Sequence, residues 1–129
     1  MEKILLNTPV EGFLEITEQV QKIVEEGKIQ HGICQIFVPH TTAAVTINEN
    51  ADPDVVTDML AALNRMIPDL PYHHGEGNSP AHVKSSLIGC SVTVPVAERR
   101  LCLGTWQGIY FCEFDGPRKR KVWVQLVGN

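Results

Sequence analysis

The chain has 129 residues, 43% of them hydrophobic and 20% charged, and its formal net charge at pH 7 is −4. These totals predict one domain, residues 1–129, that encloses its own core. The negative charge argues against binding to nucleic acid or to an anionic membrane surface. No apolar run reaches the roughly 18 residues of a membrane span, and the N-terminus does not resemble a signal peptide. We therefore expect a cytoplasmic protein.

Short apolar segments of strand character alternate with three helical patterns along the chain. In chain order they predict strands over residues 3–8 and 13–16, a helix over 17–27, strands over 33–38 and 41–47, a helix that opens at Asp52 and Pro53, a helix over 81–87, and strands over 90–96, 101–103, 109–114 and 121–127. Short turns between consecutive strands favour antiparallel pairing. The expected class is α+β, an antiparallel β-sandwich or partly closed barrel with about three flanking helices.

The cysteines form no C-x-x-C pair, and each lies in an apolar, strand-like segment: Cys34, Cys90, Cys102 and Cys112. We expect buried free thiols in a reducing cytosol. Disulfides and a zinc-thiolate site are the alternatives.

Residues 72–84 hold three of the five histidines, together with two glycines and the carboxylate of Glu76. The glycines let this segment turn tightly. Ser79 and Pro80 then predict a helix start, with the serine as N-cap and His82 in the first turn. Unpaired backbone N–H groups and the positive end of the helix dipole favour an anion there. The segment therefore suits a metal, a phosphate or both, and Glu76 is our candidate for proton transfer.

His40 lies between two predicted strands, and a period of two places Thr42 and Asn48 on the same face. That face is either a pocket wall or the solvent side of a strand. Together with His74 and His82, His40 would form a three-histidine set that leaves a metal open positions for water or substrate. The spacing matches no strong metal motif, so satisfied or exposed histidines are the alternative.

Two segments near the C-terminus carry further polar groups. Glycines flank Trp106 and Gln107, whose indole suits stacking on a heteroaromatic ring and whose amide suits the polar edge of that ring. A simple core role for Trp106 is the alternative. Arg118 opens a basic run that ends at Lys121, which is either a solvated strand edge or a phosphate clamp.

Taken together, these segments resemble the YjbQ family, also described as secondary thiamine-phosphate synthases. The likeness covers essentially the whole chain and rests on residues 38–49, His74, and residues 76–87, 103–110 and 113–118. The resemblance implies a β-rich α+β fold assembled as a homotrimer, with sites at or near subunit boundaries.

The resemblance also implies a weak activity that joins the pyrimidine and thiazole precursors of thiamine phosphate with loss of pyrophosphate. A divalent ion, zinc or magnesium, and basic side chains would neutralise the phosphorylated substrate. On this basis the expected metal ligands are His40, His74 and His82. The expected catalytic residues are His82, Glu76 and Lys84. The expected substrate-binding residues are Thr42, Asn48, Asn78, Trp106, Gln107 and Arg118.

Two alternatives of a different class stay open. One is a metal-dependent hydrolase of a phosphorylated small molecule. The other is a non-catalytic trimeric protein whose histidines bind a metal or a metabolite.

Overall fold

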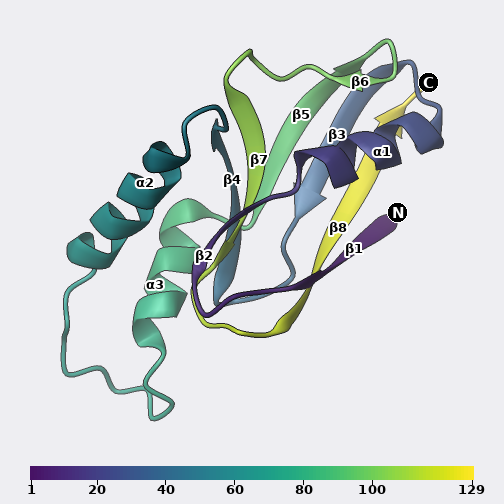
Figure 1. Cartoon of the computed structure of the whole chain (residues 1–129). Helices are drawn as coiled ribbons and strands as arrows, with labels where there is room; N and C mark the ends of the chain where they lie inside the picture. Colours follow the sequence, from purple (N-terminus) through teal and green to yellow (C-terminus); the bar gives the residue numbers. More distant parts are fainter.

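Eight strands and three helices make up the computed structural model, which describes residues 1–129 (Figure 1). In chain order they are β1 (Glu2–Asn7), β2 (Gly12–Glu15), α1 (Thr17–Gly27), β3 (His31–Phe37), β4 (Ala43–Glu49), α2 (Pro53–Met66), α3 (Ser79–Ile88), β5 (Ser91–Ala97), β6 (Arg100–Leu101), β7 (Gln107–Glu113) and β8 (Lys119–Gly128). Each lies within a few residues of a predicted element. The largest shifts are of two residues, as at α3, which begins two residues before the predicted 81–87.

The strands form two antiparallel sheets. One has five strands in the order β1-β8-β3-β5-β6, and the other has three in the order β2-β7-β4. Every strand pair is antiparallel. The two sheets curl toward each other with the helices around them, so the predicted α+β class with antiparallel sheets is confirmed.

The main core lies between the two sheets and α1. Alternation along β3 buries Cys34 and Ile36, while β7 contributes Ile109 and Phe111 from the opposite sheet. Helix α1 adds Val20 and Val24, which are four residues apart on one face and fully buried. Burying each valine contributes about 1.5–3 kcal/mol, so α1 is fixed by packing along one stripe.

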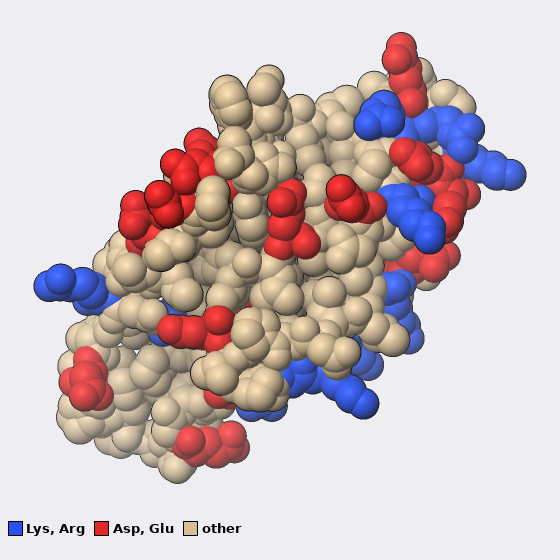
Figure 2. Space-filling model, in the orientation of Figure 1, with Lys and Arg blue, Asp and Glu red and all other residues tan.

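Charges of both signs mix on the outer side of α1, in the part of Figure 2 where this helix lies. Lys22 and Glu26 approach to 3.9 Å, and Arg100 and Glu25 to 3.8 Å, but all four side chains are at least half exposed. Exposed ion pairs of this kind add little to stability. The packed stripe beneath them holds α1 in place.

Helices α2 and α3 lie on the other side of the three-stranded sheet (Figure 1). A second apolar cluster joins them to that sheet through Ala44, Leu63, Ala81, Cys112 and Phe114. Leu63 is the only buried residue of α2, which therefore sits at the edge of the fold. None of the three helices combines the length and apolarity needed to cross a membrane.

All four cysteines are free, but only Cys34 and Cys112 are buried. Burial raises the pKa of the Cys34 thiol to about 11 and that of Cys112 to about 12. The expectation of buried thiols is wrong for Cys90 and Cys102, which are exposed. Both lie just outside a strand end, where the alternation that buries every second residue stops.

Candidate functional site

A polar cavity of about 650 Å³ opens beside the connection from β3 to β4. Its wall comes from four parts of the chain. The end of β3 and the β3–β4 connection supply residues 37–42, and the loop before α3 and the first turn of α3 supply four polar side chains. The α3–β5 connection supplies Cys90, and the start of β8 with the residue before it supplies two arginines. Besides residues 37–42, the lining consists of His74, Glu76, Asn78, His82, Cys90, Arg118 and Arg120.

Strand pairing explains why segments far apart in the sequence meet here. Phe37, at the end of β3, pairs with Trp123 of β8, and Ala43, at the start of β4, pairs with Glu113 of β7. Both ends of the β3–β4 connection are thus held beside the β7–β8 turn. At that turn Gly116 leaves no room for a side chain, because an added Cβ would meet the Pro9 carbonyl oxygen.

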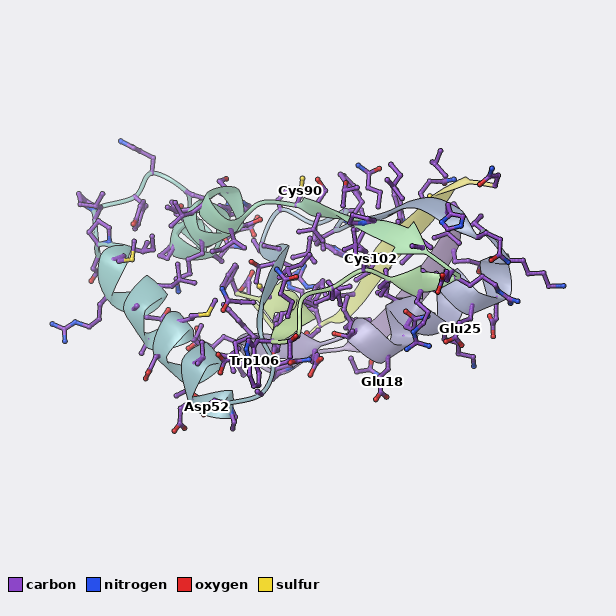
Figure 3. All side chains as sticks on the ribbon, turned by 90° about the horizontal axis from the view of Figure 1, so that it is seen from above. Glu18, Glu25, Asp52, Cys90, Cys102 and Trp106 are labelled. Atoms are coloured by element: carbon purple, nitrogen blue, oxygen red, sulfur yellow. The ribbon has the colours of Figure 1, made fainter.

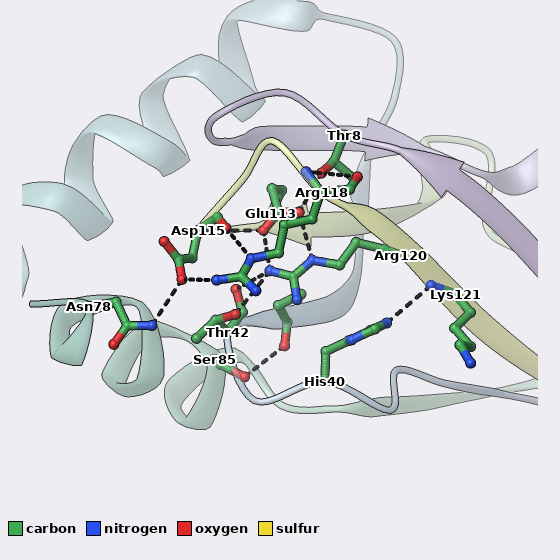
Figure 4. Close-up of polar contacts among 11 residues, drawn as sticks. Thr8, His40, Thr42, Asn78, Ser85, Glu113, Asp115, Arg118, Arg120 and Lys121 are labelled. Carbon is green, nitrogen blue, oxygen red and sulfur yellow. Dashed lines mark hydrogen bonds and ion pairs between the residues drawn. The ribbon is translucent and has the colours of Figure 1, made fainter. Parts of the chain in front are cut away.

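A buried ion pair lies behind the pocket wall, between Glu113, 0% exposed, and Arg120, 5% exposed, of which Arg120 lines the pocket (Figure 4). Arg120 Nε donates to Glu113 Oε1 at 2.8 Å, and Arg120 Nη2 donates to Thr42 Oγ1 at 2.9 Å. Thr8 also donates to Glu113. Burial raises the pKa of Glu113, but hydrogen bonds from Arg120, Thr8 and the Asp115 backbone outweigh this and lower it overall.

A second carboxylate–arginine pair lies nearer the solvent. Arg118 Nη2 contacts Asp115 Oδ2 at 2.8 Å, and Arg118 Nε donates to the Asp115 carbonyl at 2.7 Å. Asn78 Nδ2 donates to the same carboxylate at 2.9 Å, which links the start of α3 to the β7–β8 turn. The hydrogen bond from Asn78 is the main cause of a lowered pKa for Asp115. Burial raises this pKa by a smaller amount, and the hydrogen bond and charge of Arg118 lower it further. The Asn78 Oδ1 atom is buried without a hydrogen-bond partner.

The prediction of Ser79 as N-cap is wrong by one residue. Asn78 is the N-cap of α3, and its side chain makes no capping hydrogen bond. Its amide binds Asp115 instead, so Asn78 positions the helix start over the pocket by a tertiary contact rather than by a local cap. Ser79 and Pro80 are the first residues of the helix.

The structure brings the three predicted metal-binding histidines to this one pocket. The rings of His74 and His82 have centroids 5.6 Å apart and lie nearly perpendicular to each other. Glu76 Oε2 lies 3.9 Å from His74 Nε2.

His40 differs from these two histidines, because its Nε2 accepts a 3.0 Å hydrogen bond from the Lys121 backbone N–H. Burial first, and then the charge of Arg120, lowers the pKa of His40.

His74 and His82 are placed to bind a divalent ion, whereas His40 is not. Two imidazoles that share one zinc ion through bonds of about 2.0–2.1 Å have ring centres roughly 5 Å apart, close to the His74–His82 spacing. His40 does not fit as it stands, since its Nε2 lone pair is already used. No three His, Cys, Asp or Glu side chains of the chain are grouped closely enough to hold a metal ion by themselves.

Lys84 does not reach the pocket. Successive helical residues are about 100° apart, so Lys84 faces about 200° away from His82 on α3. Its ammonium group donates to Asn64 of α2 and lies 5.9 Å from the centre of the Phe114 ring. The residue is buried and joins α2 to α3.

Trp106, Gln107 and Asn48 lie at the far end of the three-stranded sheet. Asn48 and Gln107 stand at the end where Glu49 pairs with Gln107, six residues from the pocket end, or about 20 Å along the strands. Trp106 is 63% exposed, and Figure 3 shows it beside the start of α2 and well away from Cys90. Within one chain, these three residues therefore share no wall with the histidines.

Asn48 and Thr42 also separate because the chain bends before β4 begins. Thr42 is buried against Arg120, whereas Asn48 is exposed and its Oδ1 accepts from the Glu49 backbone N–H at 2.7 Å. Gln107 Oε1 accepts from the Gly104 N–H at 2.8 Å. Both amides thus make local turn contacts within the chain.

The sequence reasoning missed Glu113, Asp115, Arg120 and Cys90. A pattern in the sequence could have identified two of these residues, Glu113 and Arg120. Glu113 follows Ile109 and Phe111 at a period of two, which places its carboxylate on the core side of β7. Arg120 precedes the buried Val122 at the same period in β8. A carboxylate and a guanidinium at core positions of neighbouring elements predict a buried pair, because neither can be buried alone.

Fold and site together define an α+β protein of two curled antiparallel sheets with a histidine- and arginine-lined pocket at the end of the β3–β4 connection. The chain belongs to the family described as UPF0047 protein YjbQ-like, whose profile matches residues 2–129.

The relatives match over most of their length. The UPF0047 protein YugU of Bacillus subtilis is 51% identical over 118 residues, which cover 89% of each chain. The UPF0047 protein MJ1081 of Methanocaldococcus jannaschii is 49% identical over 92% of this chain and 87% of its own. The crystal structure of an uncharacterised YjbQ/UPF0047 protein from Clostridium acetobutylicum superimposes with a TM-score of 0.96 at 49% identity, covering 98% of this chain and 100% of that one.

Proposed function

We propose that the protein is a transferase that binds a diphosphate ester in the histidine–arginine pocket and has weak thiamine-phosphate synthase activity. The observation that carries the proposal is the convergence of Arg118, three histidines and the N-terminus of α3 on one cavity. Guanidinium groups and helix N-termini are the groups that bind phosphate oxygens. Arg118 is half exposed, so its charge is accessible to an incoming anion.

In the proposed reaction, the bond between the pyrimidinylmethyl carbon and the diphosphate oxygen breaks, and pyrophosphate leaves with the electron pair. The thiazole nitrogen then forms the new bond to that carbon. Negative charge develops on the leaving group, and Arg118 and the positive end of the α3 helix dipole would stabilise it. His82, in the first turn of α3, and the neighbouring Glu76 are the residues we place next to the reacting groups.

A divalent ion, zinc or magnesium, would be held by His74 and His82 with Glu76 beside them, and it would supply further neutralisation of the pyrophosphate. The spacing and perpendicular arrangement of the two rings support this assignment. Lys84 has no role in this proposal, because it is buried against Asn64 of α2 and does not line the pocket.

The ring-binding part of the proposal requires a second subunit. We propose a homotrimer in which Trp106 and Gln107 of one subunit complete the pocket of a neighbour. Trp106 is well exposed and lies too far from the pocket of its own chain to reach it. A tryptophan face is a suitable platform for the heteroaromatic rings of the two substrates.

Binding of inorganic pyrophosphate, measured by calorimetry with and without added zinc or magnesium, tests the proposal. Arg118→Ala should weaken binding by about 10-fold or more, because a hydrogen bond to a charged group is worth about 1.5–3 kcal/mol. Arg65→Ala is the matched control, since Arg65 is exposed on α2, away from the pocket. Equal affinities for the two variants would contradict the assignment of Arg118.

Turnover with the pyrimidinylmethyl diphosphate then separates the classes of function. Release of pyrophosphate without thiamine phosphate would indicate a hydrolase. Binding without any turnover would indicate a non-catalytic binding protein.

A further inference from the structure

We infer that His40 is a hydrogen-bond donor to the bound phosphate, through Nδ1–H, and is not a metal ligand. This inference rests on the proposed function for the identity of the ligand. It corrects the expectation of three equivalent histidines and assigns His40 to substrate positioning. The evidence is the contact that its ring makes with β8, together with the limited number of protons that an imidazole can carry.

The contact fixes which ring nitrogen carries the proton. His40 Nε2 lies 3.0 Å from the Lys121 backbone nitrogen, whose N–H can only donate (Figure 4). Nε2 must therefore be unprotonated and act as the acceptor. A neutral imidazole has one N–H, so the proton is on Nδ1. Protonating both nitrogens would set two donors against each other at this contact.

His40 accepts this hydrogen bond because the pairing of β3 with β8 stops before Lys121. Strands β3 and β8 pair only as far as Phe37 and Trp123. Lys121 lies two residues beyond that pair, so its N–H extends past the last residue of β3. The His40 ring supplies the acceptor that the strand no longer provides. This contact orients the ring, with Nε2 toward β8 and Nδ1 away from it.

A metal ion cannot use the remaining nitrogen without a large cost. Nδ1 would first have to lose its proton, and with Nε2 also unprotonated the ring would become an anionic imidazolate. The alternative tautomer would free Nδ1 but would break the bond to Lys121. His74 and His82 make no such backbone contact, so they are the two histidines of the pocket available to a metal.

The surroundings of His40 favour an anionic acceptor for the Nδ1–H. No hydrogen-bond partner for Nδ1 exists within the chain, and His40 lines the pocket. Arg120 and Thr42, which contact each other, line the same wall. A phosphate oxygen has the lone pairs and the charge to accept from this N–H and from the half-exposed Arg118 of the same pocket, whereas a cation cannot accept a hydrogen bond.

Direct observation of the tautomer is the first test. In a long-range 1H–15N correlation spectrum of the full ¹⁵N-labelled protein, His40 should show a protonated Nδ1 and an unprotonated Nε2. A protonated Nε2 would overturn the inference. This measurement decides which nitrogen of His40 can donate even if the protein binds no metal or pyrophosphate, results that would count against the proposed function instead.

Two amide substitutions separate the two nitrogens of His40. The His40→Asn amide can place an N–H near the Nδ1 position, and the longer His40→Gln can place a carbonyl near the Nε2 position. We expect His40→Asn to keep pyrophosphate affinity within about threefold and His40→Gln to lose about tenfold. Both variants should keep the zinc content of the wild type, whereas His82→Asn should lose it. Loss of zinc from folded His40→Asn and His40→Gln, checked by melting curves, would contradict the inference.

Discussion

Arg120 donates from Nε to Glu113 Oε1 across 2.8 Å in the interior of the protein, directly behind the pocket wall. Thr42 and Thr8 complete the hydrogen bonding of this pair. A buried ion pair gives little net stability compared with an apolar pair, but the loss of one partner leaves a buried charge without compensation. Replacing either partner should therefore disturb the β3–β4 connection, which Arg120 holds through Thr42 and which carries His40.

Glu113→Gln should destabilise the fold by about 3–5 kcal/mol, because it leaves the Arg120 guanidinium buried without a counter-charge. Urea unfolding followed by circular dichroism measures this change. Glu26→Gln serves as the control, since it removes only an exposed ion pair with Lys22 and should change stability by less than about 0.5 kcal/mol. Similar losses in the two variants would show that the buried pair has no special importance.

Stability should fall as the pH drops below about 4, and part of this loss should come from Asp115. The pKa of Asp115 is lower in the folded protein than in the unfolded chain. Its stabilising contribution is therefore complete above the unfolded-state pKa and is lost as the pH falls through the folded-state pKa. Asp115→Asn should be less stable than the wild type at neutral pH and should lose less stability on acidification. Parallel pH profiles for the two proteins would refute this assignment.

Much of the fold could be predicted from local patterns. The apolar, β-rich runs over residues 33–38 and 109–114 predict strands, and β3 and β7 form there. Burial alternates toward the end of β3, whereas β7 is buried on both faces. The sequence also predicts a site in residues 72–84, and two of the three histidines there, His74 and His82, line the polar cavity. What local patterns could not predict was orientation. The lysine at position 84 follows His82 by two helical positions, which turns it toward α2 and out of the pocket.

The position of Trp106 was beyond sequence reasoning for a different reason. Strand register alone decides which end of the three-stranded sheet is near the pocket, and register depends on long-range pairing of β4 with β7. Residue chemistry grouped Trp106 with the histidines but could not show whether they meet within one chain or across a subunit boundary. The β4–β7 pairing puts them at opposite ends of the sheet.

Native alkylation should modify two of the four thiols. Cys90 and Cys102 are exposed, whereas burial protects Cys34 and keeps the pKa of its thiol near 11 and that of Cys112 near 12. Mass spectrometry after brief iodoacetamide treatment should find two adducts, and four in denaturant. Pyrophosphate should slow modification of Cys90, which lines the pocket, but not of Cys102. Equal protection of both would argue against a ligand in this pocket.

Mixed trimers test whether Trp106 serves a neighbouring subunit. His82→Ala and Trp106→Ala should each abolish most activity alone. Co-expressed in equal amounts, they should recover about one quarter of wild-type activity, because a quarter of the pockets then combine an intact His82 with an intact Trp106 from the next subunit. Light scattering should confirm the trimer in each preparation. A mixture no more active than its parents would place both residues in the same subunit's site or remove Trp106 from the site.

A single-turnover assay tests most directly whether this pocket performs the transfer. The enzyme is in excess over the pyrimidinylmethyl diphosphate, and thiazole phosphate and metal are present. The wild type should release thiamine phosphate and pyrophosphate in equal amounts. His82→Ala should release neither, and Arg65→Ala, altered far from the pocket, should match the wild type. No thiamine phosphate from the wild type, or equal product from His82→Ala, would contradict the proposal that this pocket performs the transfer.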